Sequence, residues 1–222
     1  TDSGRLVMKW KGDAIVNLLR KFLDTNGTTA VADAEITEPA EKTPFDGKAK
    51  NAADKSAWLD MLSSLNCCSQ RGLVERFDSS IGASAVLHPY GGKNLSTAPE
   101  AMCSKIPLLK GDTNTGTLFS FRFNPDISKW SPFHGAQYAV LESVAKIAAS
   151  GGDVSRIRFT FQEYFEKLRD NPVRWGKPLA ALLGAFEAQM ELGCASIGGK
   201  DSMSGSFNDI DVPPTLDRKS VV

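Results

Sequence analysis

Extended and helical apolar patterns alternate along the second half of this 222-residue chain, and this alternation limits its fold more than any other feature. Residues 117–123 alternate strictly, which predicts a strand with Phe119, Phe121 and Phe123 on one face and a polar second face. The elements expected after it are a helix from Ser131 to Gly151, a strand over 157–161, a helix from Lys177 to Gly193 and a strand over 194–197. This order predicts an α/β or α+β domain, in which helices pack on one face of a mixed sheet.

The two predicted helices each carry an apolar stripe that we expect to be buried against the sheet. The stripe of the first helix consists of Ala136, Val140, Val144 and Ile147. The stripe of the second consists of Leu179, Leu182, Leu183, Phe186 and Met190.

The first half of the chain is less regular. Apolar residues at helical spacing after Gly12-Asp13 predict a helix that ends at Asn26-Gly27. Residues 28–53 are small, charged and proline-containing, and we interpret them as a linker. Asp54 is a suitable N-cap for a further helix, and residues 83–88 are expected to be extended.

The composition excludes several classes of partner. Twenty-six basic and twenty-six acidic residues cancel, so there is no overall cationic field to attract nucleic acid or an anionic membrane surface. The sequence has no run of about twenty apolar residues, and its polar start lacks the apolar core of a secretory signal, so we expect neither a spanning helix nor a leader. Four cysteines without metal-ligand spacing indicate reduced thiols, so we expect a cytoplasmic protein.

The segment from Gly198 to Ser204 carries the most suggestive chemistry. Gly198 and Gly199 would let backbone amides approach an anion, and Lys200 adds a positive charge. Asp201 could hold a metal ion, and the hydroxyl of Ser202 can donate a hydrogen bond. This combination suits a phosphate group with its magnesium ion.

Two alternative interpretations of this segment fail and one stays open. A Walker A loop would need glycine where Cys194 stands and Ser or Thr where Asp201 stands. A nucleophile elbow would need a glycine two residues away on both sides of Ser202 or Ser204. A solvated turn that is merely rich in Gly and Ser is not excluded by composition.

Glu142 and Lys146 stand four residues apart on the first predicted helix. This order and spacing favours an ion pair on the helix surface.

Three segments read together resemble phosphoribosylformylglycinamidine synthase, a member of the aminoimidazole ribonucleotide synthetase superfamily. They are Ser69–Asp78, Gly135–Ser143 and Ile197–Ser204, in the order and at the spacing of the family. The resemblance implies an N-terminal-domain-like fold of that superfamily and assigns 54–216 to the second N-type domain. Residues 1–27 then resemble the tail of a preceding C-type domain, and 217–222 are expected to be a disordered tail or a cloning scar.

The resemblance also implies a reaction. The family uses ATP and Mg²⁺ to amidate formylglycinamide ribonucleotide with ammonia made from glutamine. The chain is then a fragment, incomplete without the remaining synthetase domains and the glutaminase. In the family pattern Gly199 lies near ATP, Lys200 replaces a metal-ligand asparagine, and Ser202 matches a contact with the substrate phosphate.

The chain departs from the family at a second, pseudo-symmetric site. Related enzymes carry Asp at Arg122, Glu at Glu142 and Asn at Lys146, and these three residues bind magnesium. Only Glu142 is retained as a metal ligand, while Arg122 and Lys146 bring positive charges that can meet a phosphate or Glu142 itself. We therefore expect this site to be free of magnesium and structural.

Two classes of function follow from these expectations. One is a part of a carbon–nitrogen ligase that is inactive alone. The other is a structural or nucleotide-binding module that packs against a partner repeat. Because N-type domains pair through their sheets, the resemblance also predicts an exposed apolar sheet face and a homodimer formed through it.

Overall fold

The computed structural model describes residues 3–24, 31–46, 54–65, 67–77 and 84–222, the side chain of Arg218 excepted. The chain divides into two compact units, Thr1–Asp33 and Ala34–Val222. Among the described residues, no helix combines the length and the apolar content that crossing a bilayer requires.

The first unit is a β-hairpin, so the helix predicted from Gly12 is wrong for most of its length. Strands β1 (Arg5–Trp10) and β2 (Asp13–Leu19) pair antiparallel, and only α1 (Arg20–Asp24) is helical. Lys11 and Gly12 form the two-residue loop with φ of 48° and 96°. Positive φ at both loop positions matches the right-handed twist of a hairpin, so this local turn prevails over the helical spacing of the apolar residues. The predicted helix end at Asn26-Gly27 lies outside the described residues.

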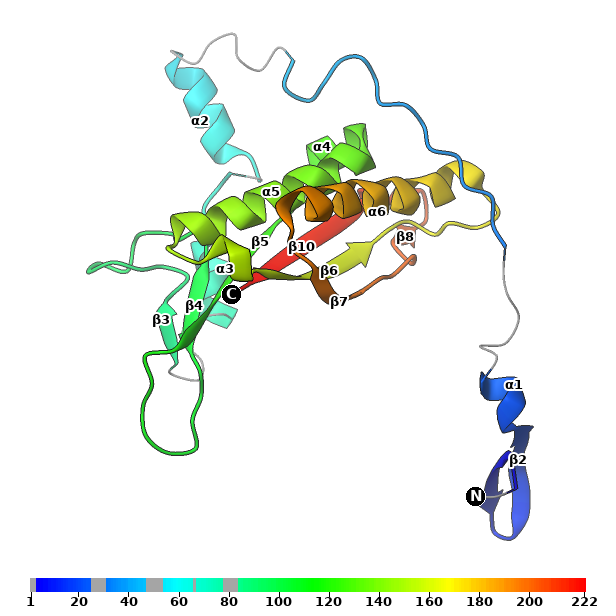
Figure 1. Cartoon of the computed structure of the whole chain (residues 1–222). Coiled ribbons are helices and arrows are strands. Elements are labelled where there is room, and N and C mark those ends of the chain that lie inside the picture. Colours follow the sequence, from blue (N-terminus) through cyan, green and yellow to red (C-terminus); the bar gives the residue numbers. More distant parts are fainter. Residues whose placement is uncertain (1–2, 25–30, 47–53, 66, 78–83) are drawn as a thin grey trace. The chain divides into compact units, whose positions relative to one another are not determined.

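The second unit contains a six-stranded mixed sheet in the order β3-β4-β5-β10-β6-β7 (Figure 1). Its strands are β3 (Ala85–Leu87), β4 (Met102–Lys105), β5 (Gly116–Arg122), β6 (Arg158–Tyr164), β7 (Ser196–Lys200) and β10 (Thr215–Val221). Only the β6–β7 pair is parallel. A separate small hairpin joins β8 (Ser206–Phe207) to β9 (Ile210–Asp211).

Strand β10 corrects the prediction for the end of the chain. Residues 217–222 were expected to be a disordered tail, yet β10 lies between β5 and β6 and bonds to both. Leu216 is 3% exposed and belongs to the core. The charged run Asp217-Arg218-Lys219 does not have the apolar pattern of a buried strand. The strand forms because its backbone pairs on both sides with β5 and β6, which are distant along the chain.

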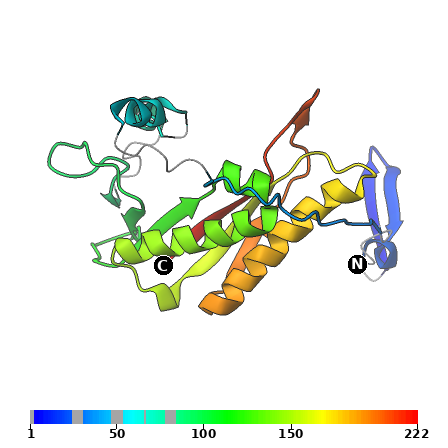
Figure 2. The same cartoon turned by 90° about the horizontal axis from the view of Figure 1, so that it is seen from above.

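Two long helices, α5 (Pro132–Ala149) and α6 (Pro172–Leu192), cover one face of the sheet (Figure 2). The predicted start of α5 after Ser131 is confirmed, since the Ser131 side chain accepts a hydrogen bond from the His134 amide. Its predicted stripe is also confirmed, with Ala136, Val140, Val144 and Ile147 all buried. The fold prediction of a mixed sheet with helices on one face is thus confirmed.

The predictions for α6 are wrong at its start and on its buried face. The helix begins at Pro172 after the N-cap Asn171, and Pro178 lies inside it. The five residues of the predicted stripe are 38–66% exposed, whereas Ala180, Ala181, Gly184, Ala185 and Ala188 are buried. A β-carbon on Gly184 would lie 2.1 Å from the Phe133 carbonyl oxygen of α5. The two helices therefore pack too closely for large side chains between them.

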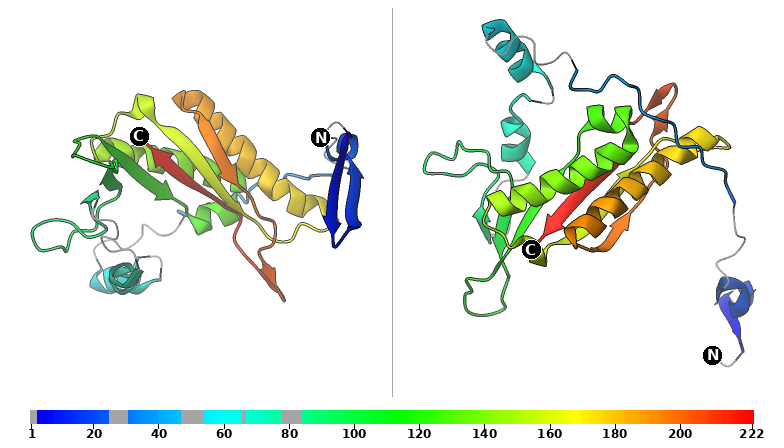
Figure 3. Two further views of the ribbon diagram at one scale, coloured as in Figure 1. Left: turned by 90° about the horizontal axis from the view of Figure 1, so that it is seen from below. Right: turned by 45° about the horizontal axis from the view of Figure 1, so that its top comes forward.

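On β5, the face that carries Ser120 is buried, and the opposite face, which carries Phe121, is exposed. Ser120 is 2% exposed, and its hydroxyl donates to the Ser143 carbonyl of α5 at 2.7 Å. The Ser220 hydroxyl of β10 donates to the Ser143 hydroxyl at 2.9 Å. Phe121, on the opposite face, is 64% exposed. In Figure 3, the view from below shows this open face of the sheet with no helix in front of β5, β10 and β6.

In the part of this unit that the structure describes, the shorter elements are three helices and one helical turn. They are α2 (Lys55–Ser63), α3 (Arg71–Phe77), α4 (Pro125–Trp130) and a 3-10 turn (Val154–Arg156). The predicted N-cap of α2 is confirmed, because the Asp54 side chain accepts a hydrogen bond from the Ser56 amide.

The predicted linker at 28–53 is described only over residues 31–46, which contain no helix or strand. Part of this segment lies against the helical layer. The Glu35 amide donates to the Pro172 carbonyl at 2.9 Å, and the Trp130 indole donates to the Ala40 carbonyl at 2.7 Å. A segment held in this way is not a free tether over these residues.

Candidate functional site

The predicted glycine-rich turn is a strand over its first part. Gly198, Gly199 and Lys200 belong to β7, and neither glycine has a positive φ. Glycine is required at 199 for a packing reason, since a β-carbon there would lie 2.9 Å from the Phe161 carbonyl oxygen. The prediction of a turn at these positions is therefore wrong, and the chain leaves the strand only at Asp201.

Beyond the strand, backbone hydrogen bonds continue along the end of β6. The Ser202 amide donates to the Glu163 carbonyl at 3.1 Å, and the Ser202 carbonyl accepts from the Phe165 amide at 2.8 Å. The Gly205 amide donates to the Phe165 carbonyl at 2.9 Å. The Ser202 and Gly205 amides are therefore already bonded and are not free to bind an anion.

Side chains suited to an anion lie along this segment. The hydroxyls of Ser202 and Ser204 lie 2.9 Å apart, and the Lys200 side chain is exposed. Lys200 has no ion-pair partner in the described part of the chain. Hydroxyls and an ammonium are groups that bind phosphate oxygens.

Two carboxylates adjoin this segment. Burial raises the pKa of Glu163, and the nearby charge of Asp201 raises it further. A raised pKa means that the negative charge of Glu163 is unfavourable in this position, and a cation would relieve it. The described residues nevertheless include no group of three or more His, Cys, Asp or Glu side chains arranged to hold a metal ion.

The second predicted set forms a separate cluster of four charges. Arg122 Nε lies 2.6 Å from Glu142 Oε2, and Lys146 Nζ lies 2.8 Å from Glu100 Oε2. Lys146 also donates to the Phe121 carbonyl at 3.3 Å. The expected ion pair between Glu142 and Lys146 does not form, because each of the two residues pairs with another partner. The expectation that Arg122 or Lys146 would meet Glu142 is confirmed for Arg122.

The electrostatics of this cluster favour its present pairs over a divalent metal. Two cations stand against two carboxylates, so the cluster has no net charge. A hydrogen bond from Lys146 and its charge hold the pKa of Glu100 below its usual range. Sequence reasoning missed Glu100, because only the pairing of β4 with β5 brings it next to α5.

The two sets are in register across the sheet but lie on different strands. Through β10, the register aligns Arg122 with Phe161, and Phe161 is paired with Gly199. β5 and β7 are three strand spacings apart, which is about 14 Å. The predicted site residues therefore gather into two groups: one runs from Gly198 to Ser202, and the other comprises Arg122, Glu142 and Lys146.

Comparison with known proteins identifies relatives of this chain, although no family model matches it. The PurL subunit of phosphoribosylformylglycinamidine synthase from Parafrankia sp. (strain EAN1pec) is 26% identical over 223 residues, covering 97% of this chain and 27% of the relative. The PurL subunit of Pyrobaculum aerophilum is 27% identical over 221 residues, with coverage of 97% and 28%. The chain thus spans little more than a quarter of the length of these relatives.

Solved structures share the fold. The structure of PurLQS from Thermotoga maritima matches with a TM-score of 0.69 at 18% identity, covering 99% of this chain and 31% of that one. Thermotoga maritima PurL complexed with FGAR gives 0.67 at 17% identity, covering 98% of this chain and 30% of the other. The chain is therefore related to PurL over nearly its whole length, and corresponds to one part of it.

Proposed function

We propose that this relative of the PurL subunits is one part of a synthase that amidates formylglycinamide ribonucleotide in purine biosynthesis. Its reaction class would be that of a carbon–nitrogen ligase that consumes ATP and glutamine-derived ammonia. The observation that carries the proposal is the similarity to PurL, which spans 97% of this chain but 27% of the Parafrankia relative. The proposal places the chain in the cytoplasm, where the sequence also predicts it.

In this proposal the segment from Gly198 to Ser202 forms one wall of a phosphate-binding site. Lys200 and the hydroxyls of Ser202 and Ser204 would bind phosphate oxygens of the nucleotide or of the substrate. Amidation through a phosphorylated intermediate depends mainly on positioning and on charge stabilisation, which such groups supply. Asp201 in that wall and Glu163, whose pKa it raises, are carboxylates that could accept a magnesium ion.

We further propose that the unit Ala34–Val222 is the second N-type domain, extended to include β10, and that residues 1–27 belong to a preceding C-type domain. The open sheet face around Phe121 would then contact another synthetase domain, or a second copy of the chain in its absence. The glutaminase is the other partner that the reaction needs.

An assay of ADP release dependent on ammonia and formylglycinamide ribonucleotide tests this function. The chain alone should show no turnover. Adding the remaining domains of a PurL relative, with that relative's own equivalent of this chain deleted, should produce it. Lys200→Ala should lower the reconstituted rate by about tenfold or more, whereas Lys110→Ala, an exposed lysine on another loop, should not change it. Failure of the mixture to turn over would count against the proposal, and turnover by the chain alone would show that it is a complete catalyst.

A second candidate function is a packing or nucleotide-binding module with a metal-free second site. The pairing of Arg122 with Glu142 favours this second candidate, because the ion pair occupies the carboxylate that a metal would need. Calorimetric titration with ADP should then give the same affinity with and without Mg²⁺. Magnesium-dependent ADP binding that Glu142→Ala abolishes would contradict the metal-free site.

A further inference from the structure

The outer face of α6 carries a row of large apolar side chains that no segment in the described part of the chain buries. We call this row the outer stripe. Its members recur every three or four residues and are 37–66% exposed: Trp175, Leu179, Leu182, Leu183, Phe186 and Met190. A continuous apolar area of a few hundred Å² on a protein surface marks an interaction site.

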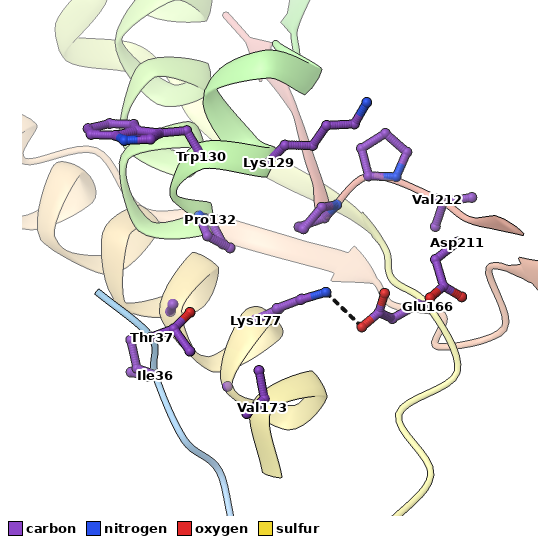
Figure 4. Close-up of a pocket in the computed structure, with 14 residues that line it drawn as sticks. Ile36, Thr37, Lys129, Trp130, Pro132, Glu166, Val173, Lys177, Asp211 and Val212 are labelled. Carbon is purple, nitrogen blue, oxygen red and sulfur yellow. Dashed lines mark hydrogen bonds and ion pairs between the residues drawn. The ribbon is translucent and has the colours of Figure 1, made fainter. Parts of the chain in front are cut away.

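The helix cannot turn the outer stripe inward, because its opposite face is fixed to the rest of the unit. The Lys177 ammonium donates to Glu166 Oε1 at 2.8 Å, and Glu166 is 5% exposed (Figure 4). Further along, Gly184 packs against the Phe133 backbone, where no larger residue fits. Residues 34–46 cross the start of α6 and leave its later turns uncovered, as Figure 2 shows. The outer stripe is therefore a preformed surface.

The spacing of the outer stripe favours a helix as its occupant. Four of its members, at positions 175, 179, 182 and 186, are separated by four, three and four residues. This is the spacing of a coiled-coil seam, in which large side chains fit between those of a facing helix. A strand or an irregular segment does not share this periodicity.

The outer stripe is also symmetric along the helix, which favours a second copy of the chain as the occupant. About a point between Leu182 and Leu183, Leu179 mirrors Phe186. Trp175 and Met190 mirror each other about the same point. When two such helices pair antiparallel about a twofold axis, each large side chain therefore meets a large apolar side chain of the other copy.

The area of the outer stripe is sufficient for a weak dimer. Six large side chains that are about half exposed offer roughly 500–700 Å² on each copy. Specific interfaces bury about 600–1,000 Å² on each partner. Because basic and acidic residues cancel, two copies do not repel each other through their net charge. We therefore expect a dissociation constant of about 10–100 μM.

We propose that two copies of this chain associate through their outer stripes, with the two α6 helices antiparallel. The proposal goes beyond the synthase function and does not depend on it. It uses the outer side of the helical layer, whereas the domain contact proposed above uses the open face of the sheet.

Sedimentation velocity of the full chain should show a monomer that becomes a dimer between about 1 and 300 μM. Leu179→Glu and Phe186→Lys should each raise the dissociation constant by about tenfold or more, because each places two charges in the apolar contact. An equimolar mixture of the two variants should associate again. The antiparallel pair brings position 179 of one copy beside position 186 of the other, where the opposite charges then meet.

Phe207→Lys is the matched control, because Phe207 is 74% exposed in β8 and lies outside the outer stripe. This variant should have the dissociation constant of the unchanged chain. Leu179 and Phe186 are 38% and 56% exposed, so their variants should remain folded, which thermal melting followed by circular dichroism checks.

Three results would overturn the proposal. The first is a chain that stays monomeric up to about 300 μM, including one that associates only with the remaining domains of a PurL relative. The second is self-association that Phe186→Lys retains, which Phe121→Lys would abolish if the contact lay on the sheet face. The third is a mixture of the two charged variants that associates no better than either alone. None of these readouts involves ammonia-dependent ADP release, so this proposal and the synthase function can fail independently.

Discussion

A chain that lacks residues 215–222 should lose its cooperative fold. The deletion removes β10, which bonds to β5 on one side and to β6 on the other. It also removes the buried side chains of Leu216 and Ser220. Loss of a core leucine alone costs about 2–5 kcal/mol, and a domain has only about 5–15 kcal/mol of stability in total. Thermal unfolding followed by circular dichroism should therefore show no cooperative transition for the deleted chain.

The matched control keeps the strand and changes one of its side chains. Lys219 is on the sheet face opposite the helices, paired with Phe121, so Lys219→Thr should retain the transition within a few degrees. If residues 215–222 were disordered, the deletion and the substitution would both leave the melting curve unchanged. That outcome would show that β10 does not form.

Gly184→Val should destabilise the second unit by at least about 3 kcal/mol. The first added carbon would lie 2.1 Å from the Phe133 carbonyl oxygen and 2.8 Å from its carbon. Both atoms are backbone, so relief requires α5 and α6 to move apart, which opens the core beneath them. Urea unfolding followed by far-UV circular dichroism measures the change in the free energy of unfolding.

Leu182→Gln on the same helix is the control for this substitution. Leu182 is 54% exposed, so its replacement should change the free energy of unfolding by less than about 1 kcal/mol. The sequence pattern alone predicts the reverse order, with Leu182 in the core. A larger loss in Leu182→Gln than in Gly184→Val would mean that α6 packs through its leucine stripe after all.

The charged cluster on α5 illustrates how far the sequence reaches into the candidate sites. Replacement of two metal ligands by Arg122 and Lys146 led to the expectation that cations would meet Glu142, and Arg122 does so at 2.6 Å. The sequence could not identify Glu100 as the partner of Lys146. The two residues are distant along the chain, and strand pairing alone brings them together.

The glycine-rich segment shows the converse. Its composition pointed to a turn that offers free amides, but Gly199 is in a strand where it packs against the Phe161 backbone. The Ser202 amide is bonded to Glu163. Whether an amide is free depends on the neighbouring strand, and local composition holds no information on it.

The sequence by itself determined the elements whose signals are local. The N-caps Asp54 and Ser131, the alternation of β5 and the buried stripe of α5 all follow from residues within one or two turns of each other. The tertiary structure decided the rest: which face of α6 is buried, which side of β5 meets the helices, and the place of β10 in the sheet. Close packing between helices favours small residues, so the most apolar face of α6 is not the buried one. A strand that pairs on both sides can be charged, so apolarity does not predict β10 either. The reason is that these choices depend on the shape and the free hydrogen-bonding groups of segments distant in the sequence.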